Sequence, residues 1–271
     1  MTSAAPNLDH VLDVALAIAH RAGDILMDKF LRLERVSKKG AVDLVTEADL
    51  ASEREIVMSI RNAFPNHAVI AEEGDYDLAQ PSPYRWVIDP LDGTTNYVHG
   101  LPIFAVSIGY QHDGDTKVGV VLNPAHNEEY TAIKGKGARL NGEPIKVSQV
   151  SQLSESLVVT GFPYTHNDLF LRTFDLFREI YGRCQGGRRL GAAAVDFCYV
   201  AAGRFEAFYE AGLNPWDLCA GDLICREAGG KTSDWQGEPI PFSGRRILAS
   251  NGLIHDQLLD VLNLPSFADI R

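Results

Sequence analysis

One stretch of this chain with high β-propensity ends in a turn that carries two carboxylates three residues apart. The stretch covers residues 84–88, and the turn reads Asp-Pro-Leu-Asp-Gly-Thr-Thr-Asn over residues 89–96. Pro90 has a fixed φ and no N–H, so we expect it to stop the strand. Gly93 permits a tight turn and a close backbone approach to a ligand. The pattern predicts a strand end that presents acids and hydroxyls, as a hard cation plus a phosphate would need.

Acidic residues recur at the ends of other predicted elements. Glu72 and Glu73 follow the apolar run 68–71, Asp49 lies where a helix opens, and Asp217 lies at the start of another helix. Asp, Gly, Pro and Thr are ordinary turn residues, so none of these positions is decisive alone. Their repetition predicts one pocket lined by several carboxylates.

Composition narrows the class of protein. A hydrophobic content of 45% over 271 residues is enough for one large core or two closely packed halves. The net charge of −11 argues against a broad nucleic-acid surface but not against a small anionic substrate, because bound cations invert the local field. The four cysteines lack C-x-x-C spacing and predict thiols in a reducing cytoplasm. We find neither the pattern of a signal peptide nor a membrane-spanning stretch.

Periodicity predicts a mixed arrangement of helices and strands. The first half has helices over residues 8–33 and 47–64, then strands over 104–110, 117–122 and 129–133 that form an antiparallel meander with a hairpin turn at Asp113-Gly114. The second half has strands over 156–160, 205–208 and 247–249, and helices over 168–181, 191–201, 215–228 and 255–262. We expect a single catalytic domain over residues 1–271, with subdomains at about 1–148 and 149–271.

Four sequence blocks resemble the inositol monophosphatase family and come in that family's order. They are residues 86–97, residues 214–221 with 227–230, residues 43–49, and residues 191–194 with 209–210. The resemblance implies an α+β fold, a layered α-β-α-β-α sandwich of the sugar and inositol phosphatase type with two tightly packed subdomains. It also implies hydrolysis of a phosphate monoester with two or three Mg²⁺ ions. The family usually has Gly where this chain has Ala71, before the Glu pair.

The acids then take candidate roles. Glu72, Asp89 and Asp92 are candidate ligands of one Mg²⁺, and Asp92 with Asp217 of a second. By resemblance the carbonyl of Leu91 is a further ligand, with a side chain that points elsewhere and tolerates any size. Thr94 is the candidate positioner of the attacking water, and by resemblance Asp49 is its partner while Glu72 also contacts that water. The alternatives are a capping hydroxyl for Thr94 and a solvated acid for Asp49.

Substrate contacts come from both halves. Gly93 and Thr94 offer backbone N–H groups to phosphate, next to Asp92 and Asp217. Gly191, Ala192 and Ala193 lie at a helix start, where free N–H groups meet a hydroxyl or an anion, unless this block serves close helix packing. Glu210 is expected to hold an inositol hydroxyl, or else to be a surface acid. Arg188 is expected to contact substrate or an interface.

These residues predict a cytoplasmic Mg²⁺-dependent phosphatase for a small phosphorylated polyol or sugar, with myo-inositol monophosphate as substrate and inhibition by Li⁺. Fructose 1,6-bisphosphate, histidinol phosphate and 3′-phosphoadenosine 5′-phosphate remain alternative substrates. A role as a protein-interaction factor in transcription or RNA processing remains a second alternative. We expect a homodimer, with Phe162, Pro163 and Phe170 as candidate interface residues, and neither membrane nor nucleic-acid binding.

Overall fold

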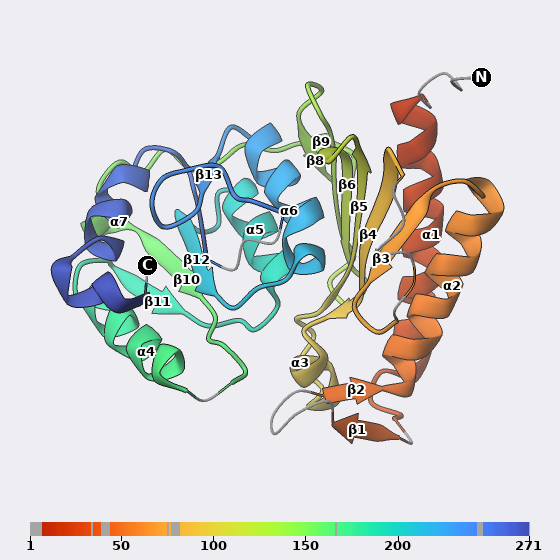
Figure 1. The fold of residues 1–271 in the computed structure, drawn as a ribbon, viewed down its shortest axis with the longest axis horizontal. Helices are drawn as coiled ribbons and strands as arrows, with labels where there is room; N and C mark the ends of the chain where they lie inside the picture. The colour runs from red at the N-terminus through yellow and green to blue at the C-terminus, as the bar shows by residue number, and fades with distance from the viewer. Residues whose placement is uncertain are drawn as a thin grey trace.

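Five layers of secondary structure follow one another in the order α-β-α-β-α (Figure 1). The computed structural model describes residues 7–33, 35–38, 44–74, 76, 82–165, 167–242 and 246–270. Helices α1 (Leu8–Lys29) and α2 (Glu47–Ala63) cover the outer face of a seven-stranded sheet, and α5 (Ala193–Ala201) and α6 (Pro215–Glu227) lie between the two sheets. Helices α4 (Asp168–Tyr181) and α7 (His255–Leu262) cover the outer face of a five-stranded sheet. The predicted layered α+β sandwich is confirmed.

The larger sheet is almost entirely antiparallel. Its strands, in spatial order, are β3 (Ala68–Ala71), β4 (Tyr84–Asp92), β5 (Ala105–His112), β6 (Asp115–Asn123), β7 (Glu128–Ile133), β8 (Ala138–Leu140) and β9 (Glu143–Pro144). Only β3 runs parallel to its neighbour, β4. Asp113 and Gly114 have φ of 53° and 77° and join β5 to β6, which is the geometry of a primed two-residue hairpin turn. The predicted meander is therefore confirmed.

The smaller sheet belongs to the second half of the chain. Its strands, in spatial order, are β11 (Gly186–Arg188), β10 (Leu157–Thr160), β12 (Ala207–Ala211), β14 (Arg246–Ser250) and β13 (Lys231–Ser233). The remaining elements are the hairpin of β1 (Val36–Lys38) with β2 (Leu44–Thr46), helix α3 (Thr94–Val98), and two 3₁₀ turns at Leu153–Glu155 and Pro265–Ile270. Among the described residues we find no helix with the length and apolarity to cross a membrane.

Pro90 does not stop its strand, which corrects the expectation from the sequence. Strand β4 continues through Pro90 to Asp92. Its pairing with β3 ends at Ile88, and its pairing with β5 is irregular between Asp89 and Asp92. Pro90 therefore lies where the ladder is already interrupted, so its missing N–H costs no regular hydrogen bond.

Helix α1 is shorter than the predicted 8–33. Its apolar stripe is buried as expected, with Val11, Ala15 and Leu26 fully covered. The helix ends at Lys29, and Leu31 has a φ of 64°, in the left-handed region that an α-helix cannot contain. The apolar period alone did not reveal this local break.

His255 is a fully buried imidazole at the start of α7. Its Nε2 lies 2.9 Å from the Ser233 hydroxyl and its Nδ1 lies 2.8 Å from the Ser250 hydroxyl. Burial, together with the nearby Lys231, lowers the pKa of His255 to about 4. The native protein therefore holds this ring neutral at a pH where the unfolded chain binds a proton.

We predict that this histidine makes the fold acid-sensitive. Because its native pKa lies below the unfolded value of about 6.5, stability is fully present above that pH and falls as the pH drops toward about 4, by up to about 3 kcal/mol. Urea unfolding of wild type and His255→Asn at a series of pH values measures this. The variant should be less stable near neutrality, but its free energy of unfolding should change less between pH 6.5 and 4. Since burial also lowers the pKa of His67 to about 4, some slope should remain. Equal slopes would contradict the prediction.

Candidate active site

A pocket of about 100 Å³ lies where the ends of β3 and β4 face the starts of α5 and α6. Five acidic side chains line it, namely Glu72, Asp89, Asp92, Glu210 and Asp217. Six further predicted site residues also line it: Leu91, Gly93, Thr94, Gly191, Ala192 and Ala193. Asp49 lies directly behind Thr94. The chain thus brings its predicted residues from both halves to one place, with the exception of Arg188.

An irregularity in β4 aims its two acids at the same pocket. In a regular strand, residues three apart point to opposite faces. Asp89 pairs with Ser107 and Asp92 with Ala105, so three steps along β4 match two steps along β5. The extra residue is a β-bulge, which restores a common direction for the two carboxylates. Both are buried and both line the pocket.

Leu91, between them, does not tolerate any size of side chain, contrary to the expectation from the sequence. Its side chain is 1% exposed and packs into the core between the large sheet and α1 with α2. Its carbonyl oxygen lies 3.1 Å from the Thr94 hydroxyl, whose single hydrogen can point to this oxygen or to Asp49. The backbone oxygen faces the site while the side chain anchors the bulge.

Asp92 joins the two halves of the molecule. Its Oδ1 accepts from the Ala193 N–H at 3.0 Å and its Oδ2 from the Ala194 N–H at 2.8 Å. These N–H groups open helix α5, where the helix dipole favours a carboxylate. The N–H of Ala193, which the sequence assigned to substrate, is therefore occupied by Asp92. Asp217 is held in a similar way, because its Oδ2 accepts from the Asn214 N–H at 2.7 Å in a capping box.

Thr94 and Asp49 form a buried hydroxyl–carboxylate pair. The Thr94 hydroxyl lies 3.1 Å from Asp49 Oδ1. Asp49 is 1% exposed, and its Oδ2 accepts from the Thr46 hydroxyl and N–H at 2.5 and 2.8 Å. Burial raises the pKa of Asp49, and the hydrogen bonds from Thr46 oppose that rise. The alternatives of a solvated acid and a capping hydroxyl are wrong: Gly93 occupies the cap of α3 and no side chain caps it.

Gly93 brings the two halves of the chain close together. Its φ is 87°, in the left-handed region. A Cβ at this position would lie 2.9 Å from the Ile103 carbonyl oxygen and 3.1 Å from the Ala192 Cβ. Any side chain would therefore separate the turn after β4 from the segment that opens α5.

The carboxyl groups repel one another. Burial raises the pKa values of Asp89 and Asp217 well above the usual range, and repulsion from Glu72 raises both further. Burial raises the pKa of Asp92 to about 7 against the hydrogen bonds from Ala194 and Ala193, and that of Glu210 to about 8 against the attraction of Arg189. Within the described ranges, no three acid, histidine or cysteine side chains are arranged so that they could hold a metal ion as they stand. The five acids of the pocket come from both halves of the chain.

Arg189, rather than the predicted Arg188, is the arginine of this pocket. Arg188 donates to the Gly187 carbonyl at 2.9 Å and is exposed, outside the pocket. Arg189 lines the pocket and lies over Gly191, where a Cβ would be 2.2 Å from its Nη1. The two arginines are adjacent in an extended segment, so their side chains point to opposite sides. The sequence contained the pair but no signal for choosing between them.

The sequence carried no signal, or a misleading one, for several other residues of the pocket. Tyr164 and Phe162 line the pocket without a motif to mark them, and Asn214 lines it as the first residue of a matching block that gave it no role. Glu210 is not the surface acid of the alternative interpretation, because a Cβ on Gly161 would lie 2.2 Å from its carboxylate oxygens. Asp43, the first residue of one matching block, lies outside the described residues.

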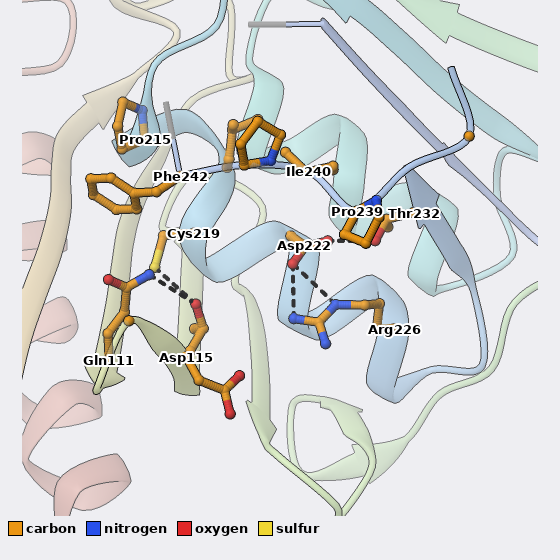
Figure 2. A pocket seen from close by; sticks show the side chains of 15 residues that line it. Gln111, Asp115, Pro215, Cys219, Asp222, Arg226, Thr232, Pro239, Ile240 and Phe242 are labelled. Atoms are coloured by element: carbon orange, nitrogen blue, oxygen red, sulfur yellow. Dashed lines mark hydrogen bonds and ion pairs between the residues drawn. The ribbon is translucent and has the colours of Figure 1, made fainter. Parts of the chain in front are cut away.

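A second, larger pocket of about 470 Å³ lies between the β5–β6 hairpin and α6 (Figure 2). Its acids already have cationic partners. Asp222 accepts from Arg226 at 2.8 Å, and Asp115 lies 2.5 Å from both Lys117 and Lys134. Size alone would favour this pocket, but the mutual repulsion of its acids singles out the smaller one as the candidate active site.

Comparison with known proteins identifies the family of this chain. The sequence model of the inositol monophosphatase family matches residues 7–264 of this chain. The protein belongs to the inositol monophosphatase family.

The relatives of this inositol monophosphatase-family chain carry two kinds of name. The Nus factor SuhB of Pseudomonas aeruginosa is 43% identical over 258 residues, which are 93% of this chain and 95% of that protein. The chloroplastic phosphatase IMPL1 of Arabidopsis thaliana is 38% identical over 257 residues, which are 93% of this chain and 69% of that protein. The solved IMPase of Thermotoga maritima is 40% identical, with a TM-score of 0.87 over 94% of this chain and 97% of its own.

We predict that Asp89 destabilises this protein when no metal is bound. Asp89→Asn keeps an acceptor for the Leu91 N–H, which is 3.0 Å from Oδ1, but removes the repulsion from Glu72, Asp92 and Asp217. At about pH 8 in EDTA the variant should melt roughly 2–4 °C higher, a gain of about 1 kcal/mol. Differential scanning calorimetry measures this. Asp222→Asn, which removes an acid paired with Arg226, is the control and should not stabilise. A lower melting temperature for Asp89→Asn would contradict the prediction.

Proposed function

We propose that this protein hydrolyses small phosphate monoesters with Mg²⁺ as cofactor, and that myo-inositol monophosphate is its substrate. The observation that carries the proposal is the gathering of five carboxyl groups from both halves in one small pocket. Membership of the inositol monophosphatase family supports the reaction class. The volume of about 100 Å³ suits a small substrate better than a polymer.

The donor set fits Mg²⁺. Carboxylate, carbonyl and hydroxyl oxygens are the hard ligands that this ion prefers, and a cation would relieve the repulsion that raises the pKa values of Asp89 and Asp217. Glu72, Asp89 and Asp92 would hold one ion, with the Leu91 carbonyl as a further ligand, and Asp92 with Asp217 would hold a second, with a total of two or three. When bound, such ions neutralise phosphoryl oxygens, acidify a water and stabilise the leaving alkoxide.

Thr94 and Asp49 supply the proton path. The Thr94 hydroxyl donates its hydrogen to Asp49 Oδ1. The lone pairs of the Thr94 oxygen are then free to accept a hydrogen bond from the attacking water. Asp49, with its raised pKa, is suited to accept the proton that Thr94 relays. Glu72 contacts the same water from the other strand.

The substrate would span the two halves. The backbone N–H groups of Gly93 and Thr94 at the start of α3 bind the phosphate. Glu210 and Arg189 bind the hydroxyl groups of the polyol, with Gly191 and Ala192 forming the adjacent wall.

A matched pair of variants tests the role of Thr94. Thr94→Ala should lower kcat by about 100-fold or more, because it removes the hydroxyl relay, whereas Thr94→Ser keeps the hydroxyl and should stay within about tenfold of wild type. Phosphate release from inositol 1-phosphate measures both. Equal rates for the two variants would remove Thr94 from the proton path.

A substrate panel tests the function itself. Phosphate release is measured with inositol 1-phosphate, fructose 1,6-bisphosphate, histidinol phosphate and 3′-phosphoadenosine 5′-phosphate, in Mg²⁺, in EDTA and with added Li⁺. We expect Mg²⁺-dependent, Li⁺-sensitive release that is fastest with the inositol ester, and loss of most activity in Asp92→Asn with the fold intact. Another ester as the best substrate would overturn the substrate assignment, and no release from any ester would overturn the function.

A second function is favoured by the relative named Nus factor SuhB, which is 43% identical. We propose that this cytoplasmic protein also binds a transcription-related protein partner, as a homodimer. Aromatic side chains cluster on α4 and the preceding loop: Phe162 and Phe174 stack with ring centroids 4.1 Å apart, and Phe170 packs edge-on against Phe174. Analytical ultracentrifugation tests the dimer, and capture of the transcription machinery by wild type and Asp92→Asn alike would separate this role from catalysis.

A further inference from the structure

Glu53 is a buried carboxylate on α2 that faces the segment following β3. It is 3% exposed. Its Oε2 accepts from the Glu73 N–H at 2.8 Å, and its Oε1 accepts from the Tyr76 hydroxyl at 3.1 Å. The segment bends closely around this carboxylate, because a Cβ on Gly74 would lie 3.0 Å from Oε1. Both oxygens of one side chain thus hold the residues that directly follow Glu72.

Tyr76 is itself held in place. Its N–H donates to the Gly74 carbonyl at 3.0 Å. The guanidinium of Arg61, two turns further along α2, lies 5.5 Å from the centre of its ring. Helix α2 therefore contacts this segment at two points, Glu53 and Arg61.

The same face of α2 also holds the other wall of the site. Asp49 lies one helical turn before Glu53 and accepts from the Thr94 hydroxyl. Ser52 donates to the Pro90 carbonyl at 2.9 Å. Successive turns of one rigid helix thus hold the bulge of β4, the start of α3 and the segment after β3.

We propose that Glu53 is a positioning residue: by accepting from Glu73 and Tyr76 it holds the backbone that aims Glu72 into the pocket, and so sets the affinity of the site for a divalent cation. The inference rests on the proposed function, because it takes Glu72 as a cation ligand. It assigns Glu53 no contact with substrate or metal. Removal of a group that holds a metal ligand in place commonly lowers the affinity for the metal by about 10–100-fold.

Two variants of Glu53 separate hydrogen bonding from charge. Glu53→Ala removes both acceptors and should raise the Mg²⁺ concentration for half-maximal binding by about tenfold. Glu53→Gln keeps an acceptor for the Glu73 N–H, and its amide can donate to the Tyr76 oxygen, so it should stay within about threefold of wild type. Glu55→Ala is the matched control on the same helix: Glu55 accepts from Arg21 at 2.7 Å, away from the 72–76 segment, and its loss should not alter Mg²⁺ binding.

The experiment is isothermal titration of Mg²⁺ into each purified variant, with hydrogen–deuterium exchange over residues 68–74. In Glu53→Ala we expect faster exchange at Glu73 and weaker Mg²⁺ binding, with kcat at saturating Mg²⁺ lowered less than the affinity. If Glu53→Ala does not fold, Tyr76→Phe, which removes one of the two bonds, should still weaken Mg²⁺ binding more than Glu55→Ala does.

The outcomes distinguish this inference from the proposed function. Wild-type protein that binds no Mg²⁺ would overturn the proposed cofactor and the inference together. Wild-type protein that binds Mg²⁺, with Glu53→Ala or Tyr76→Phe binding it equally well, would overturn the inference alone. Weak binding in Glu53→Gln as in Glu53→Ala would show that charge, and not positioning, is the contribution of Glu53.

Discussion

Two hydrogen bonds from the start of α5 to Asp92 join the two halves of the chain at the pocket. One carboxylate at the end of a strand in the first half accepts from two backbone N–H groups in the second half. Such bonds to a charged acceptor are strong, and the helix dipole adds to them. They place the acids of β3 and β4 opposite Glu210 and Asp217, so the pocket exists only where these halves meet.

This arrangement has a cost in stability. Four acids in the pocket have raised pKa values because burial and mutual repulsion disfavour their charged forms. The contrast with the larger pocket is instructive, since Asp222 and Asp115 there are paired with cationic side chains. A protein whose acids repel one another in one pocket and meet cationic side chains in another has a site whose stability depends on what binds to it.

Helix α2 shows how a rigid element supports such a site. Its Asp49, Ser52 and Glu53 contact three different segments that carry residues of the candidate active site. Helix geometry fixes the spacing of these three contacts along one axis. A pocket whose acids repel one another is thus held by contacts from a helix that contributes none of the lining residues.

From the sequence alone one can predict most of the helices and strands and the acids that line the pocket. Helices over 168–181 and 255–262 have the bounds that their apolar periods predict, and the acids of the recognised blocks meet in one pocket. Only the tertiary structure decided the direction of individual groups. The continuation of β4 through Pro90, the choice of Arg189 over Arg188, and the use of the Ala193 N–H by Asp92 all depend on which partner faces each group. Periodicity and motifs are local properties of the chain, whereas hydrogen-bond partners and burial are set by residues that are distant in sequence.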